Sequence, residues 1–210
     1  MSSLKNYRFW FASILLASSI CSADALAPSK QALLASLRHG GFTILMRHAS
    51  APREPPDAAH VNADNTKSER QLDEMGIQSA RTLGTSLHHL RIPIGEVLSS
   101  PTYRALQTVK FAELGQAITY PELGDGGQSM QANQSEARAD WLKSRASKVP
   151  IDGKNRVIVT HFPNITEAFG QSAAGLADGE ALILKPDGRG GVTVVTRLKI
   201  DEWAALDHVP

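Results

Sequence analysis

The stretch GFTILMRHAS, residues 41–50, decides the fold. Its apolar run, residues 42–46, is rich in β-forming residues and is continuous, as in a strand covered on both faces. The run ends in Arg47 and His48, two large basic groups at the end of a core strand. In open α/β sheets, ligands bind beyond the carboxyl ends of the strands. This pair is therefore the first candidate for a functional site.

Outward from this stretch, strand and helix patterns alternate along the chain. The predicted strands cover residues 42–46, 96–100, 117–123, 156–161, 180–186 and 191–200. The predicted helices begin near residue 72 and cover residues 101–114, 135–148 and 164–170. This alternation predicts an α/β three-layer sandwich, with a mainly parallel central sheet, helices on both faces and a C-terminal antiparallel hairpin.

Six residues are predicted to set the helix boundaries. Asp73 is placed to cap the first of these helices, and Ser100, followed by Pro101, to cap the second, which would end at Gly115. Asn164 and Glu167 have the spacing of a capping box for the last helix.

The N-terminal residues have the layout of a secretory signal. Lys5 and Arg8 precede an apolar run at residues 9–20, and small residues with an A-x-A pattern follow at 23–25. We therefore expect a signal peptide over residues 1–25 and an exported protein, periplasmic or secreted. A membrane anchor is the alternative, but the run is shorter than the ~18 apolar residues that a span needs. Cys21 offers a lipid-modified N-terminus as a minor alternative, and its loss with the signal would leave no disulfide.

The rest of the chain has the composition of an ordinary globular domain. It is 42% apolar and 20% charged, with a net charge of +1. We expect a single domain over residues 26–210, with no membrane span after signal cleavage. Nucleic acid is not an expected partner, since the basic surface that it requires is missing from the composition. The motifs of serine hydrolases, zinc proteases and P-loop proteins are absent from the sequence.

Three groups of polar residues follow predicted strands. Arg47 and His48 end the first strand, Arg104 lies in the first turn after the second, and His161 ends the fourth. Each alone could be structural or solvated. Together, however, two arginines and two histidines would repel one another unless they bind an anion. The pattern predicts a phosphate site at this edge of the sheet.

These motifs resemble those of the histidine phosphatase superfamily, the phosphoglycerate mutase-like proteins. LMRHAS is similar to the Arg-His-Gly signature, although Ala49 replaces its glycine. SSPTYRALQT is similar to the motif of the second arginine, and VIVTHFPNI to the segment of the second histidine. RQLDEMGIQSA and GEALILKPDG resemble family segments that follow these motifs. The resemblance covers residues 41–198 in order and, with the signal, points to the small exported phosphatases.

The resemblance implies a role for each site residue. His48 would attack phosphorus and form a phosphohistidine that water then hydrolyses. Arg47, Arg104 and a protonated His161 would bind the phosphoryl oxygens, with Thr160 as an additional contact. No metal or other cofactor is expected.

The family's proton donor follows the third strand, where TYPELGDGG offers two carboxyl groups. We expect Glu122 to be the general acid and keep Asp125 as the alternative, which could equally be a turn residue. Arg53, on the long loop after the nucleophile, could contact the far end of a substrate or be solvated.

The expected function is therefore metal-independent hydrolysis of a small phosphomonoester, with a phosphoanhydride or a phosphohistidine as alternative substrates. One alternative is a protein of the same fold that binds a phosphorylated ligand without turning it over. A phosphomutase is a second alternative, which we disfavour because it needs a bisphosphate primer that an exported protein would rarely meet.

Overall fold

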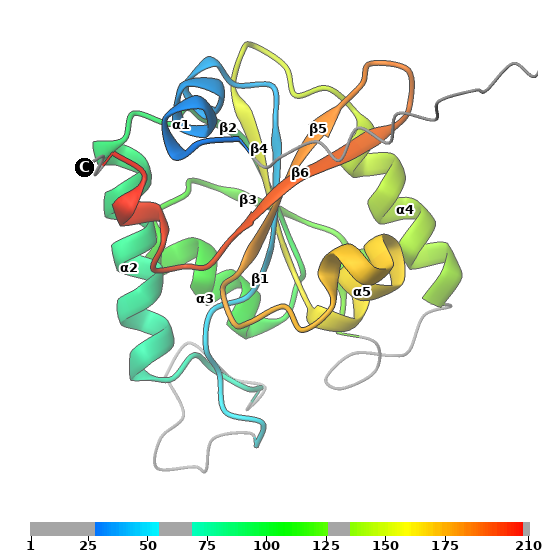
Figure 1. The fold of residues 1–210 in the computed structure, drawn as a ribbon. Helices are drawn as coiled ribbons and strands as arrows, with labels where there is room; N and C mark the ends of the chain where they lie inside the picture. Colours follow the sequence, from blue (N-terminus) through cyan, green and yellow to red (C-terminus); the bar gives the residue numbers. More distant parts are fainter. Residues whose placement is uncertain (1–27, 55–68, 126–134, 208–210) are drawn as a thin grey trace, which may run out of the picture.

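The fold is built on one six-stranded sheet, drawn in Figure 1 from a computed structural model that describes residues 28–54, 69–125 and 135–207. The strand order is β3-β2-β4-β1-β5-β6. Pairing is parallel from β3 to β1 and antiparallel from β1 to β6. The strands are β1 (Thr43–Arg47), β2 (Ile94–Ser99), β3 (Ala117–Thr119), β4 (Asn155–Thr160), β5 (Ala181–Pro186) and β6 (Val192–Leu198). The predicted mainly parallel sheet with its C-terminal hairpin is confirmed.

Helices cover both faces of the sheet, as predicted. On one face lie α1 (Lys30–His39), α2 (Glu74–His89), α3 (Tyr103–Phe111) and the short 3₁₀ turn η3 (Trp203–Ala205). On the other lie α4 (Ser135–Ser147), α5 (Phe162–Phe169) and the 3₁₀ turns η1 (Pro121–Leu123) and η2 (Gly170–Ala173). In Figure 1, α1 to α3 lie to the left of the sheet, and α4 and α5 to its right.

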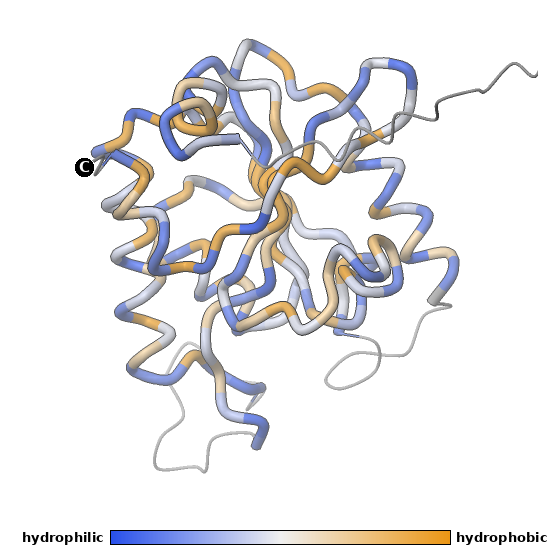
Figure 2. The backbone as a smooth tube through the Cα atoms, in the orientation of Figure 1, coloured by the Kyte–Doolittle hydropathy of each residue, from blue (hydrophilic) through white to orange (hydrophobic). Residues whose placement is uncertain are grey.

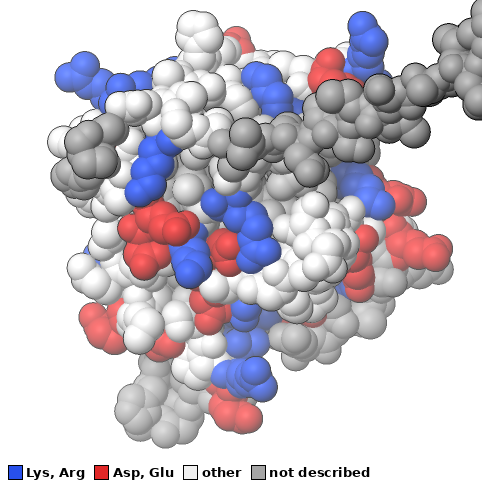
Figure 3. Space-filling view, viewed as in Figure 1, with Lys and Arg blue, Asp and Glu red and all other residues white. Residues whose placement is uncertain are grey.

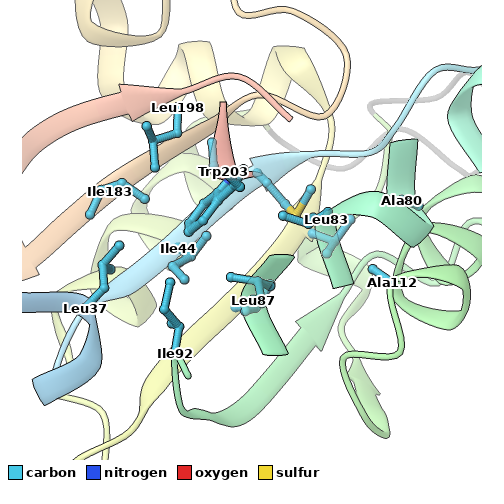
Figure 4. Close-up of a cluster of buried hydrophobic side chains, with 14 of the residues drawn as sticks. Leu37, Ile44, Ala80, Leu83, Leu87, Ile92, Ala112, Ile183, Leu198 and Trp203 are labelled. Carbon is cyan, nitrogen blue, oxygen red and sulfur yellow. The ribbon is translucent and has the colours of Figure 1, made fainter. Parts of the chain in front are cut away.

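Each central strand supplies side chains to both cores. On β1, Ile44 and Met46 belong to the cluster under α1 to α3, whereas Leu45 belongs to the cluster under α4 and α5. This explains why the strand is apolar throughout, and the hydropathy of the backbone in Figure 2 is highest where the strands cross the centre of the molecule. Trp203 closes the first cluster near the C-terminal end and is fully buried near Ile44 and Ile183 (Figure 4).

Two of the predicted helix caps were wrong, because their side chains bind tertiary partners instead. Asp73 caps α2 as expected and accepts from the Gly76 N–H. Ser100 does not cap α3: Thr102 precedes the helix, and the Ser100 hydroxyl lies 3.0 Å from a ring nitrogen of His161. Asn164 lies inside α5, which starts at Phe162, and its amide donates to the Gly124 carbonyl.

Two element ends also differ from the sequence interpretation. Helix α3 ends at Phe111, earlier than the expected boundary at Gly115. The third strand stops at Thr119, because Pro121, which has no N–H for a strand ladder, begins η1.

The predicted signal peptide lies outside the described residues. Among the helices of the described ranges, none is long and apolar enough to span a bilayer. On the face drawn in Figure 3, basic and acidic side chains are interspersed, and no single basic field covers it.

Candidate active site

The sheet order brings the predicted polar residues to one edge. Strands β2, β4 and β1 are adjacent and parallel, so their carboxyl ends meet. Arg47 ends β1 and His48 follows it, His161 follows β4, and Arg104 lies at the start of the helix after β2. The ring centres of the two histidines are 5.2 Å apart. The convergence that the sequence predicted is present.

His48 is held in one tautomer by its two neighbours. Its Nδ1 lies 2.7 Å from the carbonyl oxygen of Ala49, and its Nε2 lies 3.2 Å from Nε of Arg104. Because a guanidinium can only donate, Nε2 must carry the lone pair, and Nδ1 carries the proton. Burial, with the charges of Arg104 and Arg47, lowers the pKa of His48 to about 3, although the bond to Ala49 opposes this. The ring is therefore neutral at physiological pH, with an unprotonated Nε2.

Arg104 connects both histidines and is fully buried. Its Nη2 lies 3.1 Å from Oδ2 of Asp125 and 3.2 Å from Nδ1 of His161. A buried guanidinium is costly to desolvate unless a carboxylate compensates it, and Asp125 supplies that charge. One side chain thus fixes the relative positions of His48, His161 and Asp125.

His161 is neutral in this site, and the protonated state that we expect applies to the ring when it binds a phosphoryl group. Its Nδ1 accepts from Arg104, so Nε2 carries the proton and faces the hydroxyls of Ser100 and Thr102 at 3.0 and 3.2 Å. Burial and then the charge of Arg104 hold its pKa well below the usual range. A phosphate dianion in the site would oppose these effects, because an opposite charge favours the protonated ring.

Arg47 is anchored by a loop that the sequence did not single out. Its Nη1 donates to the carbonyl of Leu176 over 3.0 Å, and its Nη2 lies 2.6 Å from Oδ1 of Asp178. The guanidinium also lies over the ring of Phe162, 5.7 Å from its centre. Its Nε is buried and has no hydrogen-bond partner among the described residues. A buried donor without an acceptor is unfavourable, so this N–H is available for a ligand oxygen.

A pocket of about 380 Å³ opens over these residues. It is lined by Arg47, His48, Arg53, Arg70, His161, Phe162 and Pro163. A larger hollow of about 490 Å³ lies away from this edge, between α2 and the end of α3. The histidines and arginines that the sequence singled out line the smaller pocket or lie directly beneath it, so we assign the site there.

A comparison of the sequence with known protein families identifies the family of this chain. A profile of the histidine phosphatase superfamily (branch 1) matches residues 43–154, which is more than half of the chain. The chain belongs to the histidine phosphatase superfamily. The resemblance inferred from the motifs is thus confirmed.

Several solved structures share this fold at low identity. The protein histidine phosphatase SixA complexed with tungstate is 19% identical, with a TM-score of 0.56, covering 77% of this chain and 98% of its own. A mutant of the phosphoserine phosphatase from Entamoeba histolytica, in complex with phosphoserine, is 13% identical, with a TM-score of 0.52, covering 76% of this chain and 97% of its own. YhfR from Bacillus stearothermophilus is 18% identical, with a TM-score of 0.51, covering 74% and 95%. No curated protein sequence matches the chain.

The hydroxyl of Thr160 does not line the pocket. Its buried hydroxyl donates to the carbonyl of Leu123 over 2.8 Å and accepts from the amide of Asn164. These contacts tie the end of β4 to η1 and α5. Thr160 therefore holds neighbouring elements of the site together and is not placed to bind phosphate.

The two candidate acids occupy different environments. Asp125 is buried and contacts Arg104. Glu122 lies in η1, and its Oε2 is buried with no hydrogen-bond partner among the described residues. A carboxylate beside a guanidinium is favoured in its charged form, so Asp125 balances the charge of Arg104.

Sequence reasoning missed Arg70, although it begins the quoted segment RQLDEMGIQSA. Its Nε and Nη2 donate to the carbonyls of Pro52 and Ala51 at 2.5 and 3.2 Å, so it fixes the chain just after His48. Glu69 and Asp73, which lie near Arg70 in the sequence, also bind residues around the site. The N–H of Tyr103 donates to Glu69, and the hydroxyl of Ser50 donates to Asp73.

In the ranges that the structure describes, no three or more His, Cys, Asp or Glu side chains are grouped so as to hold a metal ion. The cationic groups at the pocket are arginines. The donor set suits an anion.

Proposed function

We propose that the protein is a phosphatase that hydrolyses a small phosphomonoester through a phosphohistidine at His48, without a metal. The observation that carries the proposal is the neutral His48, whose unprotonated Nε2 lies 3.2 Å from the guanidinium of Arg104 in a pocket that Arg47 also lines. A nucleophile must have a free lone pair, and the charge that develops on a transferring phosphoryl group must be stabilised. The arrangement around His48 supports both requirements.

In the first step, Nε2 of His48 attacks phosphorus in line with the ester oxygen. The new P–N bond forms as the P–O bond breaks, and the leaving alkoxide takes a proton from a carboxyl group. Arg47 and Arg104 bind the equatorial phosphoryl oxygens, and the buried Nε–H of Arg47 gains its missing acceptor. The dianion also favours a protonated His161, which then donates to a phosphoryl oxygen.

In the second step, water attacks phosphorus and the P–N bond breaks. The electron pair returns to Nε2, and the carboxylate left by the first step takes a proton from the water. The Nδ1–H bond to Ala49 is kept throughout, so the same tautomer is regenerated. Inorganic phosphate is released.

We assign the proton donor to Glu122, with Asp125 as the alternative. The contact of Asp125 with Arg104 suits a permanent charge, which leaves proton donation to Glu122. Asp125 would then orient Arg104 and balance its charge.

We further propose that the protein is exported. The signal pattern of residues 1–25 supports this. Fractionation of cells that produce the full chain, followed by N-terminal sequencing of the product, tests it: export predicts a processed N-terminus outside the cytoplasm.

The function is tested by phosphate release from a panel of phosphomonoesters, measured for the unmutated protein and for His48→Ala in a metal chelator. Turnover that survives the chelator and is lost in the variant supports the proposal. If no ester is turned over while inorganic phosphate still binds, the protein is a binding protein of this fold. Turnover that the chelator abolishes would refute metal independence.

A further inference from the structure

The guanidinium of Arg47 is held by one short loop, which joins η2 to β5 (Figure 1). It donates to the carbonyl of Leu176 and contacts the carboxylate of Asp178. The N–H of Gly179, in the same loop, donates to the carbonyl of His48 over 2.9 Å. The loop therefore contacts the nucleophile and its neighbour, and its shape sets the direction of the Arg47 guanidinium.

Burial fixes this loop at one side chain only in part of its course. Leu176 packs in the core under α4 and α5, but the next residue, Ala177, is exposed and Asp178 is partly exposed. Gly175 and Gly179 have φ angles of +63° and +69°, a region that glycine adopts freely. The turn that carries Asp178 therefore needs polar contacts to keep one conformation.

Glu180 supplies polar contacts to this turn. Its Oε2 accepts from the Ala177 N–H over 2.8 Å, and its own N–H donates to the Ala177 carbonyl over 3.2 Å. These two bonds close the turn from residue 177 to residue 180, with Asp178 inside it. The carbonyl of Glu180 accepts from the N–H of Arg47 over 3.1 Å, so the same residue joins the turn to the end of β1.

The second oxygen of this buried carboxylate binds Arg197, on the edge strand β6. Nε of Arg197 lies 2.7 Å from Oε1 of Glu180, and its Nη1 donates to the carbonyl of Ala174 over 2.7 Å. One guanidinium thus fixes the start of the loop and, through Glu180, its end. Burial would raise the pKa of Glu180, but the bonds from Arg197 and the Ala177 N–H outweigh it and hold the pKa below its usual value. The carboxylate is therefore charged at physiological pH.

We propose that Glu180 and Arg197 are positioning residues, which act on catalysis by holding the loop that orients Arg47. The inference rests on the proposed function and deepens it. Neither residue is among the described residues that line the pocket, so neither is placed to touch substrate. When the turn loses its shape, Arg47 loses its two anchors. The phosphoryl group must then order this long side chain itself, which weakens binding of the transition state.

The test is a double-mutant cycle between Glu180 and Arg47. The unmutated protein, Glu180→Gln, Arg47→Lys and the double variant are compared by kcat/KM for p-nitrophenyl phosphate and by the Kd of inorganic phosphate, from calorimetry. Urea unfolding of each protein gives its folded fraction, and activity is compared per folded molecule. Arg197→Gln enters a second cycle with Arg47→Lys, because its side chain is 31% exposed and its loss disturbs folding less.

Glu96→Gln is the matched control. Glu96 also binds two arginines, Arg145 and Arg156, but it lies near the start of β2, at the opposite end of the sheet from the pocket. Its replacement should lower the free energy of unfolding as well. Its effect on kcat/KM per folded molecule should stay below about twofold and be the same in the unmutated and Arg47→Lys backgrounds, as for distant, independent sites.

We expect Glu180→Gln and Arg197→Gln each to lower kcat/KM by about tenfold or more, the scale of a misplaced binding group, and to weaken phosphate binding. In the Arg47→Lys background the same changes should lower kcat/KM by less than about twofold, because the loop no longer has a guanidinium to orient. Equal factors in both backgrounds, or no loss per folded molecule in either, overturn the inference and leave the phosphatase proposal standing. If no ester is turned over, the phosphatase proposal fails, and the Kd values of phosphate decide the inference separately: equal factors in both backgrounds overturn it.

Discussion

Nε of Arg104 donates to Nε2 of His48 over 3.2 Å, so a buried cation holds the one ring nitrogen that carries a lone pair. The same guanidinium contacts His161 and Asp125. The Arg104 donor lies beside the nitrogen that a phosphoryl group must approach. Binding of phosphate must therefore redirect this donor from the ring to a phosphoryl oxygen.

Replacing Arg104 by lysine should abolish most activity while keeping the charge. An ammonium cannot contact His48, His161 and Asp125 from one planar group, so stabilisation of the transition state is lost. We expect kcat to fall by about 10²- to 10³-fold, as when one oxyanion donor is removed. Steady-state phosphate release measures it. Arg81→Lys, on α2 with its guanidinium over Phe111, is the control and should retain activity.

The identity of the proton donor predicts a dependence on the leaving group. Glu122→Gln should slow hydrolysis of an alkyl phosphate by about 10²-fold or more, since its alkoxide needs a proton. It should slow p-nitrophenyl phosphate much less, because nitrophenolate leaves unprotonated. Asp125→Asn should slow both esters equally through Arg104. If Asp125→Asn instead shows the dependence on leaving group, the acid is Asp125.

The depressed pKa of His48 predicts a loss of stability in acid. The pKa of His48 is about 3 in the folded protein against 6.5 for an unperturbed ring, so the unfolded state takes up a proton that the folded state does not. The free energy of unfolding should therefore fall as the pH drops from about 6.5 towards 3. His161, whose pKa is also lowered, acts in the same direction. Urea unfolding at pH 7, 5 and 4 measures the effect.

His48→Gln serves as the comparison for this pH dependence. Its unfolding free energy should change less between pH 7 and 4 than that of the unmutated protein, because one of the two buried rings is gone. Parallel curves for the two proteins would show that His48 titrates normally in the folded state.

Gly76 permits the contact between α2 and the chain after the nucleophile. A Cβ at this position would overlap the backbone oxygen of Ser50. We expect Gly76→Ala to lower the free energy of unfolding by about 1–3 kcal/mol, as for overpacking, and to impair turnover by displacing residues near His48. Thr82→Ala, exposed on the same helix, should change stability by less than about 0.5 kcal/mol. Equal stability of the two variants in chemical denaturation would contradict this account.

The fold could be predicted from the sequence wherever burial sets the pattern. The apolar runs of β1 and β4 and the Asp73 cap of α2 are local signals, and the structure has all three. The caps at Ser100 and Asn164 were wrong because each side chain found a tertiary partner, His161 and Gly124, that sequence spacing does not show.

The site was predictable only where chain order alone fixes position. Arg47, His48 and His161 end adjacent strands, so parallel topology is sufficient to bring them together. The anchoring of Arg47 by Asp178 depends on the path of a loop, and no periodicity encodes that path. Arg70 could have been found from its place in a quoted motif, but its contacts to Ala51 and Pro52 could not. The neutral state of His161 depends on burial, which residue type does not reveal.

The central claim, a covalent intermediate on His48, is tested most directly by trapping it. The protein is mixed with a rapidly hydrolysed phosphomonoester and quenched in alkali, in which phosphohistidine is stable, and its peptides are analysed by mass spectrometry. We predict a phosphoryl group on His48 that appears within the first turnover, disappears as substrate is exhausted, and is absent from His48→Ala. Steady turnover by His48→Ala, or a phosphoryl group on a different residue, would contradict the account.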